Sequence, residues 1–188
     1  MPAPSADPPL RQDALRNRRL LLEAAARAFR AKGLQASVNA IAADAGVNVA
    51  TLYRHFPSKE ELLHAVLEAT LEPLVVARDE ALAADGDQLA TFVHHAVRLQ
   101  AAHRGLIDAI AWEPESAEVR ARLRDPAVAI VAPLVEAAHR RGELRGDLDA
   151  TDVLVALRML AALPEPATSS DPRYRPERYV DLLLAAMR

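Results

Sequence analysis

The sequence predicts an all-α protein in two parts: an N-terminal three-helix head containing a helix-turn-helix, and a C-terminal helical bundle. Hydrophobic residues make up 51% of the 188 residues and aromatic residues only 4%, and this alanine-rich composition favours helices. Apolar residues recur at helical spacing, with glycine and proline between the periodic segments. Residues 37–62 read as two short helices joined by a tight turn, with a third helix directly after them.

The N-terminal segment divides into an arm and a long helix. Residues 1–10 contain four prolines and no apolar core, so we expect a disordered arm and no signal peptide. An apolar stripe predicts the first long helix over Asp13 to Lys32, which ends at Gly33. The stripe consists of Leu21, Leu22, Ala25, Ala28 and Phe29.

Local signals predict the helix-turn-helix. Ser37 is a candidate N-cap for a first short helix, and Gly46 supplies the positive φ that ends it. Asn48 is the candidate N-cap of a second helix over Val49 to His55, which Pro57 stops. Helix, glycine-containing turn, helix is the layout that places one exposed helix in a DNA major groove. An ordinary helical hairpin in a protein that never touches DNA has the same spacing.

The residues in this stretch are more specific than the spacing. The segment AGVNVATLYRHFPSKEELL closely resembles the motif of the TetR family of bacterial transcriptional regulators, and the resemblance extends from Leu15 to about Val66. It implies a homodimer that binds a palindromic double-stranded DNA operator and is usually a repressor, released when a small molecule binds.

The resemblance also implies two kinds of DNA contact. Tyr53, His55 and Lys59 match family positions that hold phosphates, helped by backbone amides near Ser37 and Asn48. Positions that meet base edges in the family are occupied here by Asn39, Val49, Ala50 and Thr51. Val49-Ala50 replaces a common polar residue and glycine, so we expect sparse hydrogen-bond readout and a larger part for DNA shape.

Charge is distributed unevenly along the chain. The formal net charge is -3, but Leu10 to Glu60 holds nine Lys/Arg and four Asp/Glu, a net charge of +5. The remainder therefore carries -8, as expected for a DNA-binding head on an acidic body. We expect three regions: residues 1–10 as arm, 11–60 as DNA-binding domain, and 61–188 as ligand-binding and dimerisation domain.

Six further helical segments are expected in the bundle. Pro73 should kink or break the first, and Gly105 should interrupt the long segment that starts at Gln88. Asp149 should cap the fifth, and the last should bury a stripe of Tyr179, Leu182, Leu183 and Ala186. The segments expected are Lys59–Ala84, Gln88–His103, Leu106–Trp112, Asp125–Arg141, Asp149–Leu163 and Pro176–Met187, with a short charged segment at Ser116–Arg124.

Two stretches, Ala127 to Val135 and Val153 to Leu163, are apolar on nearly every side of their predicted helices. Such a pattern is typical of helices buried against both their own core and a partner. They predict a homodimer interface of two helices from each subunit, and Arg158 reads as a residue at its rim or as one whose charged end reaches solvent. The interface residues expected are Val128, Val131, Val135, Val155 and Met159.

A ligand pocket is predicted inside the bundle. Gln100 lies on an apolar stripe with His103 one turn later, and buried polar groups need partners, which a ligand or the neighbouring backbone can supply. The expected lining is Phe92, Ala96, Gln100, His103, Ile107 and Trp112.

Several function classes are not supported by the sequence. No cysteine is present, and His94 and His95 are helix neighbours that point in different directions, so we expect no metal and no cofactor. No convergent catalytic groups and no apolar run of membrane-spanning length appear, so we expect no enzyme and a soluble cytoplasmic protein. The alternative to a regulator is a helical ligand-binding adaptor that kept the fold without operator binding.

Overall fold

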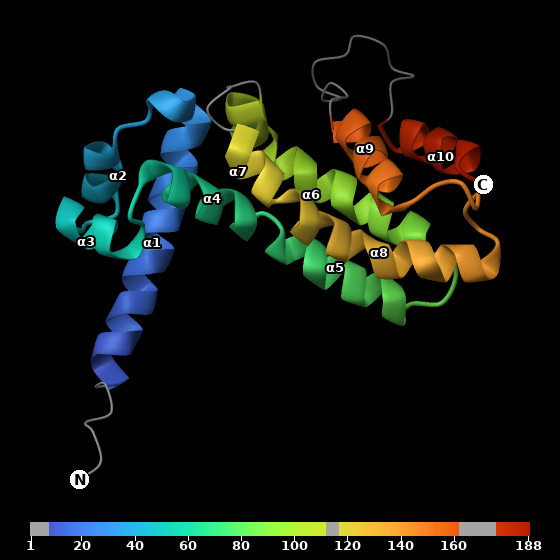
Figure 1. Ribbon diagram of the computed structural model, residues 1–188, viewed down its shortest axis with the longest axis horizontal. Coiled ribbons are helices and arrows are strands. Elements are labelled where there is room, and N and C mark those ends of the chain that lie inside the picture. The colour runs from blue at the N-terminus through green and yellow to red at the C-terminus, as the bar shows by residue number, and fades with distance from the viewer. Residues whose placement is uncertain (1–7, 112–116, 162–175) are drawn as a thin grey trace. The chain divides into compact units, whose positions relative to one another are not determined.

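The computed structural model describes residues 8–111, 117–161 and 176–188, which form helices and turns with no strand among them (Figure 1). They divide into two compact units. The first unit contains the chain up to Ala69 together with Gly105–Arg120, and the second contains Thr70–Arg104 and Ala121–Arg188. The predicted all-α class is confirmed. The first unit extends past the expected boundary at residue 60 and includes a later segment.

The first unit is built on one long helix. It contains α1 (Pro8–Lys32), a 3-10 turn η1 (Gly33–Gln35), α2 (Val38–Asp44), α3 (Val49–His55) and α4 (Lys59–Ala69). Helix α1 packs against α2 and α4, and α2 packs against α3. The large side chains that are fully buried in these helices are Leu21, Phe29, Ile41, Leu52 and Leu62. The predicted stripe of α1 is thus the floor on which the helix-turn-helix lies.

Helix α1 begins earlier than the sequence suggested. The expected arm covered residues 1–10, but Pro8, Pro9 and Leu10 are already helical. Proline is compatible with the first turn of a helix, because its φ angle is preset and its missing N–H would have no partner there. The proline pair was therefore evidence for a helix start, and only residues 1–7 of the expected arm lie outside the described residues.

The second unit is a helical bundle. Its helices are α5 (Glu72–Ala83), α6 (Gln88–Ala111), α8 (Arg124–Arg141), α9 (Ala150–Ala161) and α10 (Pro176–Ala186), while α7 is the short helix Ala117–Arg122. From Gly105 onward α6 belongs to the first unit, as does most of α7. Helix α8 packs against α5 and α9, and α9 packs against α10. The core holds Phe92, Val131, Leu134, Val153, Leu157 and Val180.

Proline and glycine act differently at the two expected interruptions. The segment expected over Lys59–Ala84 is broken between Ala69 and Glu72, and Pro73 lies in the first turn of α5 rather than at a kink. Gly105 does not interrupt α6, which runs from Gln88 to Ala111 as one helix. A glycine inside a helix costs only about 1 kcal/mol relative to alanine, which the flanking turns can offset.

The predicted stripe of the last helix is wrong. Tyr179, Leu182 and Ala186 are exposed on α10, and only Leu183 of that set is partly buried. The residues that face the core are Val180, Leu184 and Met187. Both faces of this helix are apolar, so periodicity alone could not identify which face packs within the unit.

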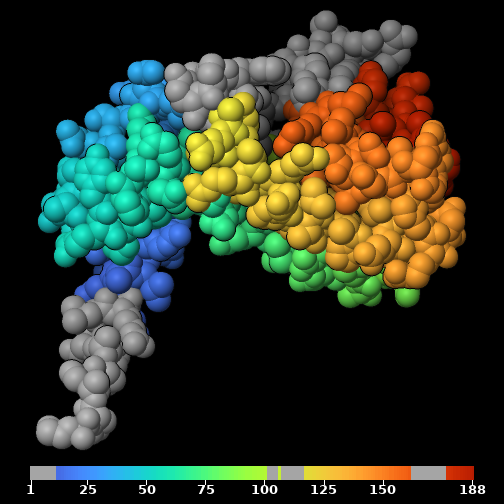
Figure 2. Space-filling view, in the orientation of Figure 1, coloured from blue at the N-terminus to red at the C-terminus, as the bar shows by residue number. Residues whose placement is uncertain are grey.

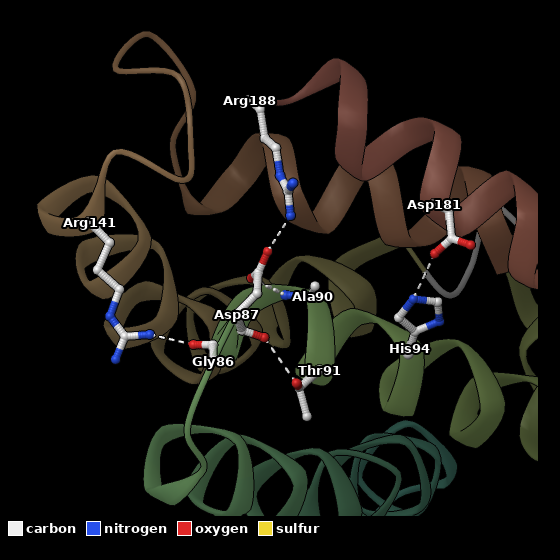
Figure 3. A network of polar contacts seen from close by, with 8 residues as sticks. All are labelled: Gly86, Asp87, Ala90, Thr91, His94, Arg141, Asp181 and Arg188. Atoms are coloured by element: carbon white, nitrogen blue, oxygen red, sulfur yellow. Dashed lines mark hydrogen bonds and ion pairs between the residues drawn. The ribbon is translucent and has the colours of Figure 1, made fainter.

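Polar contacts tie the end of the chain to the α5–α6 loop (Figure 3). Asp87 Oδ1 accepts a hydrogen bond from Ala90 N at 2.8 Å, which caps α6, and Asp87 Oδ2 accepts one from Arg188 at 2.6 Å. Arg141 donates to the carbonyl of Gly86, and His94 Nε2 lies 3.0 Å from Asp181 Oδ1. These contacts join α6, α8 and α10 at positions distant in sequence.

The N-cap predicted at Asp149 is confirmed. Its Oδ1 accepts hydrogen bonds from the backbone N–H groups of Thr151 at 2.7 Å and Asp152 at 3.1 Å. These two donors lower the pKa of the Asp149 carboxyl because they stabilise its charged form. In the described parts of the chain, no helix is both long enough and apolar enough to cross a lipid bilayer.

Candidate nucleic-acid interface

Helix α3 is held at its start by the side chain predicted to cap it. Asn48 Oδ1 accepts a hydrogen bond from Thr51 N at 2.7 Å, while the Asn48 carbonyl accepts from Thr51 N and Leu52 N. Gly46 supplies the turn before it, with a φ of 72° that other residues rarely adopt. At the other end Phe56 is buried and its N–H bonds to the Leu52 carbonyl. Both ends of α3, the second helix of the predicted helix-turn-helix, are therefore held by hydrogen bonds.

One face of α3 is open to solvent. Leu52 is fully buried, and residues two positions away lie about 200° around the helix from it. Ala50 and Arg54 occupy that opposite face and both are exposed, with Tyr53 47% exposed beside them. Figure 2 shows α3 at the surface of the first unit. An exposed face on the second helix of a helix-turn-helix is the surface that such a motif presents to a DNA major groove.

The other predicted contact residues lie in α2, α3 and α4 or at the N-caps of α2 and α3. Ser37, Asn39 and Asn48 are exposed or half-buried at the start of α2 and α3, and Val49, Thr51 and His55 lie on the flanks of α3. Ser37 has the position of an N-cap, but its side chain makes no capping hydrogen bond, contrary to the prediction. All the predicted phosphate and base positions thus belong to one compact unit.

Arg54 was not among the predicted contact residues. Its Nη2 donates to Thr51 Oγ1 at 2.8 Å, so the guanidinium is held along the exposed face of α3. The signal that could have found it is its place opposite Leu52 on a short helix. Arginine also has the fork of donors that binds guanine or phosphate oxygens.

Lys59 has a structural contact in addition to its predicted role. Its ammonium donates a hydrogen bond to the backbone carbonyl of Leu34, which joins the first residue of α4 to η1. The side chain is half-buried. An ammonium has three donors, so this bond leaves capacity for an anionic oxygen.

Two acidic side chains near the interface, Asp44 and Glu60, have defined hydrogen-bond partners. Arg27 Nη2 donates to Asp44 Oδ2 at 2.8 Å, which neutralises the acid at the end of α2. At the start of α4, the Ser58 hydroxyl accepts a hydrogen bond from Glu61 N at 3.2 Å, which is one half of a capping box. A backbone N–H and the Ser58 hydroxyl lower the pKa of Glu60, so its carboxylate stays charged near Lys59.

The expected dimer residues fall into two groups. Val131 and Val135 are buried in the core of their own unit, so they offer no surface to a second copy, and Val128 packs against that core. Val155 and Met159 are 49% and 62% exposed one turn apart on α9. Tyr179 and Leu182 are also exposed on the neighbouring helix α10. The apolar stretch Ala127 to Val135 of α8 reflects the packing of this helix against α5 and α9.

The predicted pocket residues are described only in part. Phe92 and Ala96 are completely buried in the core of the second unit. Gln100 Oε1 is buried and has no hydrogen-bond partner among the described residues. Trp112 and the side chains of His103 and Ile107 lie outside what the structure describes. An orphaned buried acceptor is rare in folded proteins and requires an explanation.

Metal-binding geometry is not found in the described residues. Among the side chains that the structure describes, no three or more of His, Asp or Glu converge where they could hold a metal ion.

Two protein families match this chain along most of its length. The family described as bacterial regulatory proteins, tetR family, matches residues 21–66. The family described as the C-terminal domain of SbtR-like transcriptional regulators matches residues 84–188. An HTH-type transcriptional regulator of Staphylococcus aureus (strain bovine RF122 / ET3-1) is 36% identical over 67 residues, which cover 35% of this chain and 36% of that protein. The match thus spans about a third of the length of this curated relative.

Solved structures extend the similarity over both units. A TetR transcription regulatory protein from Mycobacterium vanbaalenii is 33% identical with a TM-score of 0.58, covering 95% of this chain and 99% of that one. A TetR transcriptional regulator from Streptomyces coelicolor is 30% identical with a TM-score of 0.56, covering 91% and 98%. A TetR family regulator from Thermus thermophilus is 28% identical with a TM-score of 0.61, covering 88% and 97%. The chain belongs to the TetR family of bacterial transcriptional regulators.

Proposed function

We propose that this protein is a ligand-responsive repressor that binds a palindromic DNA operator as a homodimer and leaves it when a small molecule binds. The observation that carries the DNA-binding part is the capped helix α3, whose outward face carries Ala50, Tyr53 and Arg54 opposite the buried Leu52. Asn39 on α2 adds a side chain that can pair with adenine, and Val49, Ala50 and Thr51 offer apolar groups to thymine methyls.

Phosphate contacts give this interface its register on the duplex. Tyr53, His55 and Lys59 present a hydroxyl, a ring nitrogen and an ammonium, all of which donate to anionic oxygen. Arg54 adds a guanidinium that Thr51 already orients. Because the side chains of Val49 and Ala50 cannot hydrogen-bond to bases, sequence preference depends strongly on the shape and deformability of the DNA.

Dimerisation is assigned to α9 and α10. Val155, Met159, Tyr179 and Leu182 are large apolar side chains that these two packed helices leave exposed. A twofold axis through such a surface gives a four-helix interface, and a twofold dimer matches an inverted-repeat operator. This assignment keeps the predicted Val155 and Met159 and replaces the buried valines of α8 with residues of α10.

Ligand response is assigned to the core of the second unit. Gln100 places a buried acceptor, unpartnered among the described residues, near the apolar residues of α6, and a ligand donor would satisfy it. A ligand that binds the DNA-incompetent state more tightly weakens operator binding by its difference in affinity, typically about 1–3 kcal/mol. In this proposal, residues 11–60 act on DNA and residues 61–188 sense ligand and dimerise.

The test is selection of binding sites from a pool of random-sequence duplexes with the purified full chain. The proposal expects enrichment of an inverted repeat, bound with an affinity that falls steeply with salt. Failure to retain any duplex at low salt would contradict it and favour the adaptor alternative. Enrichment of a single half-site without a repeat would contradict the homodimer while leaving DNA binding in place.

A further inference from the structure

The N-terminal half of α1 extends beyond the part of the helix that packs in the first unit. Ala14 lies seven residues before Leu21, on the same helical face, yet Leu21 is fully buried and Ala14 is exposed. Leu15 is 69% exposed, the highest value among the large hydrophobic side chains of the described residues. In Figure 1 this half of α1 continues past α2, α3 and α4. It is therefore a helical arm, defined as residues 8–19, in which the side chains from Gln12 to Arg16 are all exposed.

The arm starts beside the end of α3. The Arg18 guanidinium lies over the ring of Phe56, 5.0 Å from its centroid, and Phe56 is the C-cap residue of α3. Ten residues separate Arg18 from the first residue of α1, which corresponds to about 15 Å of helix. The arm thus extends away from α3 by several phosphate spacings, whereas the other end of α1 leads into η1.

The charged side chains of the arm are mostly basic. Between Asp13 and Arg19, three arginines, Arg16, Arg18 and Arg19, stand against one acid, Asp13. Arg16 is exposed, and the contact of Arg19 with Glu23 is a 3.7 Å pair between side chains that are both mostly exposed. Such a surface pair contributes little to stability, so a phosphate can displace it at small cost.

We propose that this arm is a second DNA-binding element, in which Arg16 and Arg19 bind backbone phosphates that flank the half-site contacted by α3. The proposal rests on the DNA-binding function proposed above and assigns to it a surface outside the helix-turn-helix. The occupant is duplex DNA, because the arm combines positive charge and exposure with proximity to α3. The contacts are sequence-blind, so the arm adds affinity and salt dependence without adding base preference.

The experiment compares the wild type with three full-length variants on one duplex enriched from the random pool. The arm variant is R16Q with R19Q, the control is R30Q with K32Q at the other, exposed end of α1, and the rescue is R16K with R19K. Each pair of neutralising substitutions removes two positive charges, so the overall charge is matched. The plot of log K against log salt should be shallower by about 3–4 per dimer in the arm variant, and close to wild type in the other two.

A second measurement shortens the DNA. Removing the base pairs outside the enriched repeat should weaken binding by the wild type and leave the arm variant unaffected. The arm variant could instead keep the wild-type salt slope and the wild-type dependence on DNA length. This result would overturn the proposal that the arm binds DNA, while leaving the proposed function intact. A wild type that binds no duplex would overturn both. Equal losses in the arm and control variants would also overturn the arm, since they would reflect net charge alone.

Discussion

Lys59 donates a hydrogen bond through its ammonium to the backbone carbonyl of Leu34, joining two residues 25 positions apart. One end of this bond is the first residue of α4 and the other is in η1. The side chain that resembles a phosphate-binding residue in the TetR family therefore also fixes the start of α4 against the segment between α1 and α2. Its loss has two separable consequences.

For Lys59→Ala, we expect unfolding to become easier by about 1–2 kcal/mol, because a partly buried carbonyl loses a charged donor. The salt slope of duplex binding should fall by about 1–2 per dimer as well. Urea denaturation and binding titrations measure the two effects. Lys32→Ala is the control, because Lys32 is exposed at the end of α1. Wild-type stability in Lys59→Ala would show that the bond to Leu34 contributes nothing in solution.

Asn48 allows the cap of α3 to be separated from its charge. Asn48→Ala removes the acceptor of Thr51 N and should destabilise the protein by about 0.5–2 kcal/mol. Asn48→Asp keeps an acceptor but places a negative charge at the DNA surface, so stability should be retained while duplex binding weakens. Thermal melts and binding titrations of both variants are the measurement. Tight duplex binding by Asn48→Asp would show that no DNA phosphate lies close to the side chain at position 48.

Base readout is tested at Asn39. Asn39→Ala should lose about 1–3 kcal/mol of binding to the enriched half-site and almost nothing on random duplex, because a base contact carries sequence information.

Arg54→Gln should lose affinity on both DNAs if its guanidinium binds phosphate. Competition titrations with the two duplexes distinguish these roles. Equal losses on both duplexes for Asn39→Ala would assign Asn39 to the phosphate backbone.

The dimer surface is tested at Val155. Val155→Glu should give monomers and abolish operator binding, because a charge would be buried where two apolar surfaces meet. Val76→Glu is the matched control, since Val76 is 56% exposed on α5, and it should stay dimeric. Sedimentation at micromolar concentration measures the assembly. A monomeric wild type, or monomers from both variants, would refute the assignment to α9 and α10.

Gln100 should be costly to stability in the absence of ligand. Gln100→Met removes the buried acceptor while nearly keeping the volume, so the ligand-free protein should gain about 1 kcal/mol. The same change should reduce the response of DNA binding to any small molecule that releases the wild type. Thermal melts and release assays are the two measurements. A less stable Gln100→Met would show that the amide is satisfied in solution.

Sequence signals succeeded where the determinant is local. The cap at Asn48, the turn at Gly46 and the end of α8 at Arg141 each depend on a few neighbouring residues, and each is found where predicted. The candidate DNA-contact residues followed from the family motif and the helical period. Arg54 was missed because the contact residues were assigned from the family motif alone, although its place two residues after Leu52 puts it on the opposite face of α3.

Signals that depend on tertiary packing were less informative. Helix α10 has two apolar faces, and the sequence could not show that Val180 and Leu184 face the core while Leu182 faces outward. In the same way, Val131 and Val135 looked like interface residues because the sequence alone does not show that α5 and α9 cover α8. Hydrophobicity indicates burial, and only the fold identifies the covering element.

The division of the chain into units restricts how such a gene can recombine. The first unit takes its residues from two separate stretches, up to Ala69 and again from Gly105 to Arg120, and the second stretch includes the buried side chains of Leu106 and Val119. A single crossover near residue 69 would therefore pair one parent's first stretch with the other parent's second stretch. Exchange of whole heads at residue 69 would thus separate the two stretches that form the first unit, whereas point substitution on α2 and α3 leaves them together.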